Sequence, residues 1–183
     1  MVDKTSYMFI TGPRVVKTVT GEDVSTDSLG GARVQNTKSG AAHFFASDER
    51  EAVDLIKRLL SYLPQNNMED PPYSKTDDPP DRIDESLNAL IPTDPSKSYN
   101  ILELINRVFD LRSFFEVHQM FAANAVVGFA RLDGMPIGLV ANQPAVMAGV
   151  MDINSSDKIA RFVRFCDCFN IPIATFVDVP GYM

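Results

Sequence analysis

Residues 125–141 read AVVGFARLDGMPIGLVA, and this stretch decides the fold. Two apolar runs, Ala125–Leu132 and Pro136–Ala141, are joined by Asp133-Gly134, a dipeptide that is typical of tight β-hairpin turns. Successive side chains of a strand point to opposite faces, and both runs are apolar on both faces. Both faces of the hairpin are therefore expected to be buried. The stretch therefore predicts two antiparallel strands within a covered sheet.

The residues after the hairpin predict a helix and then another strand. Ser155–Phe169 places apolar side chains on one arc at helical spacing: Ile159, Phe162, Val163, Phe165, Cys166 and Phe169. Asn154 or Ser155 is expected to cap this helix. Ile171–Val179 is expected to form a buried strand. A strand, a helix and a strand in this order predict a right-handed parallel crossover and an α/β sheet.

The N-terminal part predicts a short strand followed by helices. Tyr7–Ile10 is apolar and has the length of a buried strand, and Pro13 suits the first turn of a helix that Gly21 ends. Ser47–Leu63 has an acidic first turn, a broad apolar face and an N-cap candidate in Ser47. Gly30-Gly31 lies between these helices, where it permits either a close approach of the backbone or an ordinary tight turn.

The composition changes at Pro64–Asp81, which is rich in proline and aspartate and offers little to bury. We interpret this segment as a linker between two parts of the chain. Beyond it, Asn100–Phe109 predicts another amphipathic helix and Phe114–Val117 an extended segment. The second part thus has the more complete set of elements, and it is expected to be better ordered than residues 1–63.

Composition excludes several classes of function. The 183 residues include 17 Lys and Arg against 24 Asp and Glu, so the net charge of −7 lacks the basic footprint of a nucleic-acid-binding protein. Two cysteines cannot form a disulfide framework, and they favour a reducing, cytoplasmic setting. No apolar run approaches the roughly 20 residues that span a bilayer, and residues 1–13 lack the apolar stretch of a signal peptide.

Histidine and cysteine give little evidence of catalysis. Glu116 and His118 fall on one face of the predicted extended segment, where they form either an acid/base pair or a satisfied polar edge. His43 is expected to be structural. Cys166 and Cys168 point about 200° apart on a helix, so they cannot hold one ion together, and Cys166 is expected to lie in the core.

Lys158, Arg161 and Arg164 form a basic stripe on the predicted helix. We interpret the stripe as a solvated face, with phosphate binding as the alternative. The chain has no phosphate-binding loop, and it also lacks the G-x-G-x-x-G, H-E-x-x-H and G-x-S-x-G motifs. Neither a metal nor a nucleotide is therefore expected to bind.

Several segments, taken in order, resemble those of biotin-dependent acyl-CoA carboxyltransferases. In the first part they are Thr5–Pro13, Val15–Lys17, Val19–Val24, Leu29–Ala32 and Lys38–Gly40. In the second part they are Val127–Arg131, Gly138–Pro144, Asp152–Ser156, Ala160–Asp167, Phe169–Ile173 and Val177–Gly181. The resemblance covers essentially the whole chain. It extends to the propionyl-CoA carboxylase β subunit, the methylmalonyl-CoA carboxyltransferase core subunit and the methylmalonyl-CoA decarboxylase α subunit. Gln35, where many members carry His, and Tyr182, where Phe is usual, leave the subfamily open.

The resemblance implies an α/β fold of the crotonase-like (ClpP/crotonase) type, a ββα superhelix, with parts of two such domains. Residues 1–75 would be the C-terminal portion of an N-terminal carboxyltransferase domain, which ends in the linker at 64–81. Residues 78–183 would be the first part of the C-terminal domain. The chain is then expected to be an internal fragment that is inactive alone, because the family's two backbone oxyanion holes would lie outside it.

The resemblance also implies the chemistry. A carboxyl group would move between carboxybiotin and an acyl-CoA, with propionyl-CoA and methylmalonyl-CoA as the expected substrates. Biotin would be carried on a separate carrier protein or domain. The expected partners are the acyl-CoA, the biotin carboxyl carrier protein and further copies of the subunit, as a hexamer in the parent. Neither nucleic acid nor direct membrane insertion is expected, and the expected compartment is the cytoplasm or the mitochondrial matrix.

Two alternative functions remain open at this point. The chain could belong to the methylmalonyl-CoA decarboxylase α subunit of a sodium-pumping complex. It could also be a non-catalytic remnant that only binds the subunits of its parent.

The resemblance places an acyl-CoA-binding segment at about Asp110–Gln143. No side chain of this chain is expected to be catalytic, and no metal site is expected. The candidates for the acyl-CoA and biotin pocket, each of which could instead be a structural turn, are Gly12, Pro13, Gly30, Gly31, Asn142, Gln143, Pro144, Val179, Pro180 and Gly181.

Overall fold

A computed structural model describes residues 1–94 and 97–183. The chain divides into two compact units, Met1–Leu59 and Leu60–Met183, which are treated separately below. Within the described residues, no helix is both long and apolar enough to cross a membrane.

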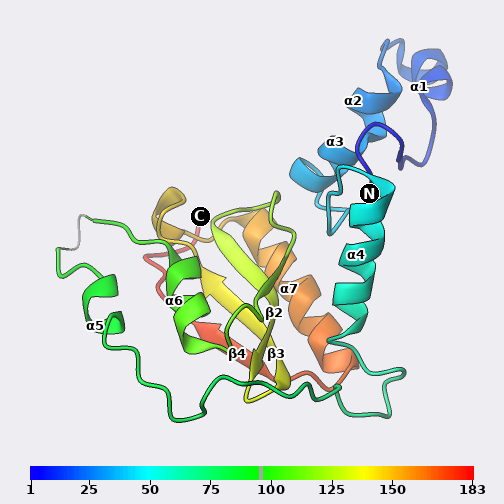
Figure 1. Ribbon diagram of the computed structural model, residues 1–183. Coiled ribbons are helices and arrows are strands. Elements are labelled where there is room, and N and C mark those ends of the chain that lie inside the picture. The colour runs from blue at the N-terminus through cyan, green and yellow to red at the C-terminus, as the bar shows by residue number, and fades with distance from the viewer. Residues whose placement is uncertain (95–96) are drawn as a thin grey trace. The chain divides into compact units, whose positions relative to one another are not determined.

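The described residues of the second unit form a four-stranded sheet in the order β1-β2-β3-β4 (Figure 1). Its strands are β1 (Phe115–Val117), β2 (Ala125–Leu132), β3 (Met135–Asn142) and β4 (Ile173–Phe176). β2 pairs antiparallel with both β1 and β3, whereas β3 and β4 are parallel. The predicted hairpin and the predicted parallel strand pair are both confirmed.

The hairpin turn depends on left-handed backbone at Asp133 and Gly134, whose φ angles are 49° and 76°. Left-handed backbone at both central residues matches the right-handed twist of the flanking strands. The buried Asp110 carboxylate holds the turn from outside: Oδ1 accepts from Asp133 N at 2.9 Å, and Oδ2 accepts from Gly134 N at 2.8 Å. The register of β2 and β3 is therefore set by turn chemistry and by a carboxylate clamp.

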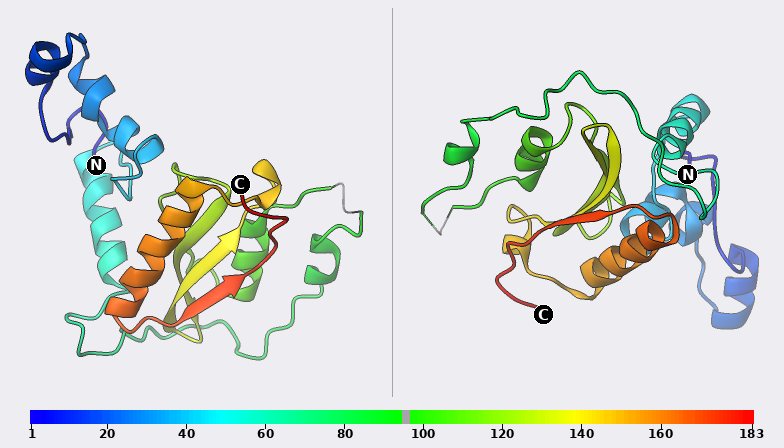
Figure 2. Two further views of the ribbon diagram at one scale, coloured as in Figure 1. Left: turned by 180° about the vertical axis from the view of Figure 1, so that it is seen from behind. Right: turned by 90° about the horizontal axis from the view of Figure 1, so that it is seen from below.

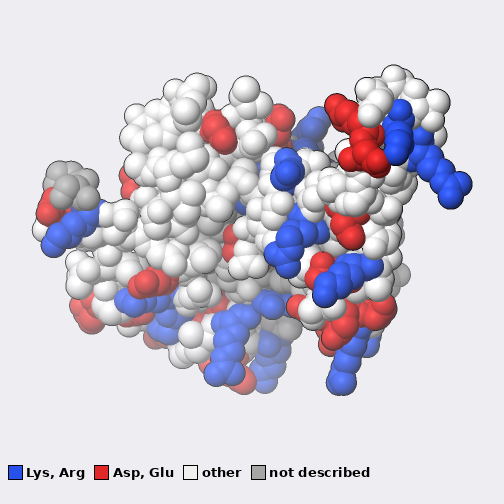
Figure 3. All heavy atoms as spheres, turned by 90° about the horizontal axis from the view of Figure 1, so that it is seen from above, with Lys and Arg blue, Asp and Glu red and all other residues white. Residues whose placement is uncertain are grey.

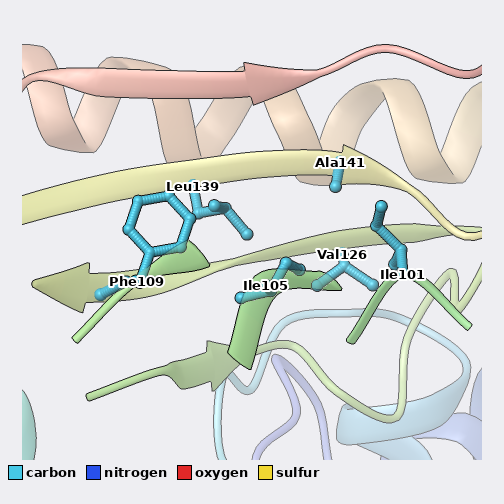
Figure 4. Close-up of a cluster of buried hydrophobic side chains, with 7 residues drawn as sticks. Ile101, Ile105, Phe109, Val126, Leu139 and Ala141 are labelled. Atoms are coloured by element: carbon cyan, nitrogen blue, oxygen red, sulfur yellow. The ribbon is translucent and has the colours of Figure 1, made fainter. Parts of the chain in front are cut away.

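One face of the sheet is covered by α6 (Ile101–Val108). Ile101, Ile105 and Phe109 pack against side chains of the central strands, as Figure 4 shows. The strand residues of this cluster are Val126, Ala130, Leu139 and Ala141. They alternate along β2 and β3, so one face of the hairpin is buried here, as predicted.

The opposite face is covered by α7 (Ile153–Cys168) (Figure 2). The Phe129 and Phe162 rings have centroids 5.2 Å apart. A Cβ added to Gly138 would lie 2.6 Å from Cys166 Sγ, so the glycine lets the helix approach the sheet closely. The expectation of a sheet covered on both faces is confirmed.

The start of α7 differs from the expected capping by Asn154 or Ser155. Asp152 is the N-cap, since its side chain accepts from Ser155 N at 2.8 Å. The Ser155 hydroxyl accepts in return from Asp152 N at 2.9 Å, which completes a capping box. The helix therefore begins before either predicted cap.

The face that α7 buries also differs from the predicted arc. The fully buried residues are Ser155, Lys158, Phe162 and Cys166, so the stripe contains a lysine that was expected in solvent. Phe165, expected on the buried arc, is 37 % exposed. Only tertiary contacts with the strands and the turn before β2 fix which side of the helix faces inward.

The prediction of a buried strand at Ile171–Val179 is wrong in extent and in burial. β4 covers only Ile173–Phe176, and its residues are partly or largely exposed. Among the described strands, β4 is an edge strand that pairs only with β3. Position in the sheet, which is a tertiary property, therefore limits the burial of this apolar run.

The segment predicted as a linker, Pro64–Asp81, and the residues beside it make specific contacts with the rest of the second unit. The Tyr62 ring is buried against Phe129, with centroids 5.6 Å apart. The Arg131 guanidinium lies over Tyr62 and donates to Pro72 O at 2.9 Å. Arg82 also donates, to Arg107 O at 2.7 Å. This part of the chain is thus held by the packing of Tyr62 and by hydrogen bonds in both directions, into it from Arg131 and out of it from Arg82. A short helix, α5 (Leu87–Leu90), follows this segment.

The first unit contains α1 (Pro13–Thr20), α2 (Thr26–Gly30), α3 (Ala32–Thr37) and all but the last residue of α4 (Glu49–Leu60). The predicted helix from Pro13 to a stop at Gly21 is confirmed, with Gly21 left-handed at φ 77°. The predicted strand at Tyr7–Ile10 is not formed. Tyr7 makes only an isolated bridge to Gly31, and all four side chains are exposed. Apolar character alone does not make a strand where no extended partner runs alongside.

The predicted helix at Ser47–Leu63 is present in shortened form as α4. Asp48 caps it in place of Ser47, since Asp48 Oδ1 accepts from Glu51 N at 2.8 Å. None of the residues Glu49–Leu60, all of which are described, is fully buried. Val53, Ile56 and Leu60 are 47 %, 56 % and 60 % exposed, so the described residues leave much of this apolar face uncovered.

We predict that Gly138→Ala lowers the free energy of unfolding by about 1–3 kcal/mol, because the new methyl group overlaps Cys166 Sγ. Cys166→Ala should relieve this overlap. The double variant should therefore lose less free energy of unfolding than the two single variants lose in sum. Urea unfolding of the four proteins measures the coupling. Gly181→Ala serves as the control, because a Cβ there meets nothing within 4 Å. Strict additivity would contradict the close approach of α7.

We also predict that the backbone amides of α4 exchange with solvent at least about tenfold faster than those of α7. The reason is that α7 has four fully buried side chains, whereas α4 has none. Hydrogen exchange followed by NMR or mass spectrometry on the monomeric chain makes the comparison. Equal protection of the two helices in a cooperatively melting monomer would contradict it.

Candidate functional site

The carboxyl ends of β3 and β4 lie at the same edge of the sheet, because these two strands are parallel. The chain leaves β3 through Asn142, Gln143 and Pro144, and it leaves β4 through residues 177–181. Ligands of open α/β sheets bind outside the carboxyl ends of parallel strands. Six of the ten pocket candidates, Asn142–Pro144 and Val179–Gly181, belong to these two exits.

Asn142 ties the two exits together. Its Nδ2 donates to Gly149 O at 3.1 Å, and its Oδ1 accepts from Asp178 N at 3.3 Å. The side chain is buried, and its bond to Gly149 O is shielded from water. One amide therefore sets the spacing between the loop after β3 and the segment after β4.

Gln143 ties the same loop to the start of α6. Its Oε1 accepts from Ile101 N at 3.2 Å, and its Nε2 donates to Asn100 Oδ1 at 2.8 Å. Asn100 is the N-cap of α6. Gln143 thus satisfies one of the amide groups that a helix leaves unpaired at its first turn.

The loop after β3 contains a strained turn, η1 (Met147–Gly149). Met147, Ala148 and Gly149 have φ angles of 51°, 53° and 75°. Left-handed backbone costs roughly 1–2 kcal/mol at each non-glycine residue, and strain of this kind clusters at ligand-binding sites. A Cβ added to Gly149 would lie 3.0 Å from Asp178 O, so the turn packs closely on the segment after β4.

The segment after β4 is held on both sides. Met151 N donates to Gly181 O at 3.1 Å, and Met183 N donates to Met151 O at 2.9 Å. The Tyr99 hydroxyl donates to Asp178 Oδ2 at 2.8 Å. Burial and this bond raise the pKa of Tyr99 to about 12. The polar groups at this end of the sheet are thus mostly engaged with the backbone of the two exits.

The surface around these exits is largely uncharged, as Figure 3 shows for the end of the second unit near its C-terminus. Its exposed side chains include Met147, Ile153, Val177, Tyr182 and Met183. An apolar surface beside ordered backbone amides and carbonyls suits an uncharged or acyl-bearing ligand better than a nucleic acid.

The remaining pocket candidates, Gly12, Pro13, Gly30 and Gly31, lie in the first unit. The ring of Phe9 lies beside two of them: a Cβ on Gly12 would lie 3.5 Å from it, and one on Gly30 only 2.5 Å. A Cβ on Gly31 would lie 2.7 Å from Asp27 O. The two adjacent glycines therefore serve close backbone approach, with Gly31 at a φ of −65°.

The Glu116–His118 pair does not lie on one strand face as predicted. β1 ends at Val117, and His118 turns the chain with a φ of 55°. His118 is buried, whereas His43 is exposed. Burial also raises the pKa of the Glu116 carboxyl.

Cys166 is fully buried, as expected, and this burial raises the pKa of its thiol to about 12. Cys168 is exposed. Among the described residues, no group of three or more His, Cys, Asp and Glu side chains is placed to hold a metal ion.

The interpretation of Lys158 as part of a solvated stripe is wrong. Arg161 and Arg164 are exposed, but Lys158 is 0 % exposed. Burial lowers the pKa of Lys158 to about 8, opposed by the nearby charge of Glu116. Sequence reasoning also missed Tyr99 and Asp178, which bind each other, and Asn124, whose Nδ2 donates to Val150 O at 2.8 Å. No motif in the chain pointed to these residues.

Comparison with known proteins places the whole chain in one family. The family model described as "Carboxyl transferase domain" matches residues 1–183. The propionyl-CoA carboxylase carboxyltransferase subunit of Haloferax mediterranei is 56 % identical over 183 residues, which are 100 % of this chain and 36 % of that protein. The methylmalonyl-CoA decarboxylase subunit alpha of Veillonella parvula is 52 % identical over 183 residues, which are 100 % of this chain and 36 % of that protein. The chain thus spans about a third of the length of these relatives.

A solved structure of transcarboxylase 12S with hydrolyzed methylmalonyl-coenzyme A bound superposes with a TM-score of 0.95 and 45 % identity. The match covers 100 % of this chain and 36 % of that one. That protein is described as a hexamer and as a multienzyme core. The match confirms the crotonase-like α/β fold class that the sequence resemblance implied.

We predict that Tyr99 titrates near pH 12 and that Asp178→Asn moves its pKa back towards the ordinary value of 10.0. The carboxylate accepts a hydrogen bond from the neutral hydroxyl group and disfavours a phenolate beside it. Because the pKa is raised in the folded chain, the stabilisation holds below pH 10 and is lost as the pH rises to about 12. Absorbance at 295 nm, as a difference against Tyr99→Phe, measures the titration. With Asp157→Asn as the charge-matched control, equal shifts in the two variants would rule out the contact.

Proposed function

The chain belongs to the carboxyl transferase domain family, and from this membership we propose that it forms part of a biotin-dependent acyl-CoA carboxyltransferase subunit. The proposed reaction moves a carboxyl group between carboxybiotin and an acyl-CoA, with propionyl-CoA and methylmalonyl-CoA as the substrate pair. The observation that carries the proposal is the family match over every residue, 1–183. The 56 % identity to a propionyl-CoA carboxylase subunit supports the choice of acyl chain.

The geometry of the two strand exits supports this chemistry. The loop 143–151 is ordered by buried amides, and its neighbours are apolar. An uncharged ring such as that of biotin fits a surface of this kind, which would supply backbone groups and apolar contact.

We propose the same two-part domain assignment as the sequence resemblance implies. Residues 1–75 would end an N-terminal carboxyltransferase domain, and 78–183 would begin the C-terminal one. The division into compact units at Leu59 and Leu60 supports two parts, although it falls earlier in the chain.

The proposed partners are an acyl-CoA, a biotin carboxyl carrier protein and further copies of the subunit. Biotin would be supplied on that carrier and not attached to this chain. The hexamer described for transcarboxylase 12S supports a homo-oligomer, and we propose a hexamer.

A second candidate function is carboxyl transfer within a methylmalonyl-CoA decarboxylase. The 52 % identity to the alpha subunit from Veillonella parvula favours it specifically. The two candidates share the transfer of a carboxyl group between acyl-CoA and biotin, and they differ in what consumes carboxybiotin. A product assay can therefore separate them.

We predict that the native protein, isolated from its source with an antibody against residues 1–183, converts methylmalonyl-CoA to propionyl-CoA only when biotin or a biotinylated carrier is added. Avidin should abolish the reaction. Carboxybiotin that accumulates without gas release indicates the transferase, whereas sodium-dependent release of CO2 indicates the decarboxylase. Avidin-insensitive turnover, or none at all with a biotinylated carrier, would contradict the proposal.

We further predict that Asn142→Ala, introduced into the same gene, lowers kcat/KM for methylmalonyl-CoA by about tenfold or more. The variant removes both hydrogen bonds that align the two strand exits. Asp167→Asn, a change at an exposed position on α7, is the matched control and should retain full activity. An Asn142→Ala enzyme with unchanged kinetics would place the reaction away from this edge of the sheet.

A further inference from the structure

Lys158 is a fully buried cation whose partners are all backbone carbonyls. Its Nζ donates to Phe121 O at 2.8 Å, to Ala125 O at 2.7 Å and to Ala122 O at 3.3 Å. An ammonium group has three N–H donors, and here each of them has an acceptor. Burial of a charge is unfavourable unless its hydrogen bonds are satisfied, so this position is narrowly defined.

The three carbonyls belong to the turn that connects β1 with β2. Phe121 N donates to His118 O at 3.0 Å, and Ala125 N donates to Ala122 O at 3.1 Å. Ala122 is left-handed with a φ of 45°. The turn thus points its carbonyls inward at α7, and without the ammonium group these dipoles would repel one another.

The same turn carries Asn124, which reaches both ends of the loop 143–151. The backbone O of Asn124 accepts from Gln143 N at 2.9 Å, at the start of the loop. The Asn124 Nδ2 donates to Val150 O at 2.8 Å and to Asp152 Oδ1 at 3.2 Å, at the end of the loop. The Asn124 side chain is itself buried.

We propose that Lys158 is a positioning residue: its ammonium group fixes the turn 121–125 and, through Asn124, holds both ends of the loop 143–151 at the candidate site. The importance of this loop for carboxyl transfer rests on the proposed function. The positioning itself does not, and it is measured below without any assay of activity.

Two carboxylates lie near this network. Glu116 on β1 attracts the Lys158 ammonium, and Asp152 at the start of α7 binds Asn124. Burial raises the pKa of Glu116, and the bonds from Ser155 lower that of Asp152. Lys158 has a pKa of about 8, lowered by burial. A neutral amine keeps only two N–H groups, so one carbonyl loses its donor above that pH.

The test compares hydrogen-exchange protection in the 183-residue chain and in Lys158→Met, which keeps the apolar stem and removes the donors. The reporting amides are those of Gln143, Val146 and Val150, with the Gly134 amide at the turn of the hairpin as internal reference. We expect the three loop amides to lose about tenfold or more in protection relative to Gly134. Phe162→Leu weakens the contact of α7 with Phe129, so it should instead lower the hydrogen-exchange protection of all four amides alike.

Two further measurements separate a positioned cation from mere packing. In Lys158→Ala, ethylammonium chloride should restore loop protection, whereas sodium chloride at the same ionic strength should not. In the unaltered chain, loop protection corrected for intrinsic exchange should fall relative to Gly134 above about pH 8, and Lys158→Met should lack this step.

A uniform loss over the loop and Gly134 would overturn the proposal, as would unchanged protection in Lys158→Met. If the lysine variants do not fold, Asn124→Ala decides, because it cuts the connection downstream of the turn. We expect protection to fall at Val150, whose carbonyl loses the Asn124 side-chain donor, with Gly134 unchanged. If Asn124→Ala produces no such selective loss, the proposal is overturned. Failure of the transfer assay with loop protection behaving as expected would contradict the proposed function alone.

Discussion

The two central strands must bury both of their faces, and the arrangement of the second unit follows from this requirement. Val126, Ala130, Leu139 and Ala141 present one apolar face, which α6 covers. Phe129 and Gly138, which are direct partners in the ladder, present the other face to α7. Because α7 runs back along the sheet, β4 enters parallel to β3, and their carboxyl ends meet at one edge. The candidate site is therefore a consequence of core packing.

Buried polar groups fix the two ends of this sheet. At the turn of the hairpin, the Asp110 carboxylate accepts from the Asp133 and Gly134 amides. On the side that leads to the loop 143–151, the Lys158 ammonium donates to three carbonyls of the turn before β2. An apolar core tolerates small shifts, whereas a buried charge that depends on backbone groups tolerates few. The strands are thus stabilised by apolar burial, and the loops around them are positioned by these polar anchors.

How far the sequence predicted this structure depended on the range of the interactions involved. Asp133-Gly134 and the periodicity of residues 155–169 predicted the hairpin and the helix, because turn chemistry and helical spacing are local. Lys158 was predicted to be exposed because a charged side chain is usually solvated. The carbonyl groups that bind it lie 33 to 37 positions earlier in the chain, so the local sequence does not reveal them. Tyr7–Ile10 read as a strand for the same reason: whether an extended partner exists is a tertiary property. Asn142 and Gln143 became candidates only through the family resemblance, since nothing local distinguishes an amide that bridges two strand exits.

A site that acts through main-chain groups leaves little trace in residue types. Under the proposed function, the acyl group and the biotin ring would meet ordered backbone and apolar surface here, so the chain needs no histidine–carboxylate pair for this reaction. What the sequence must encode instead is the conformation of the loops. At Met147, Ala148 and Gly149 this means a left-handed turn, whose cost the neighbouring hydrogen bonds of Asn142 and Asn124 offset. The residues that matter most at such a site are those that hold the backbone in place. Buried amides and a buried lysine fill that role here.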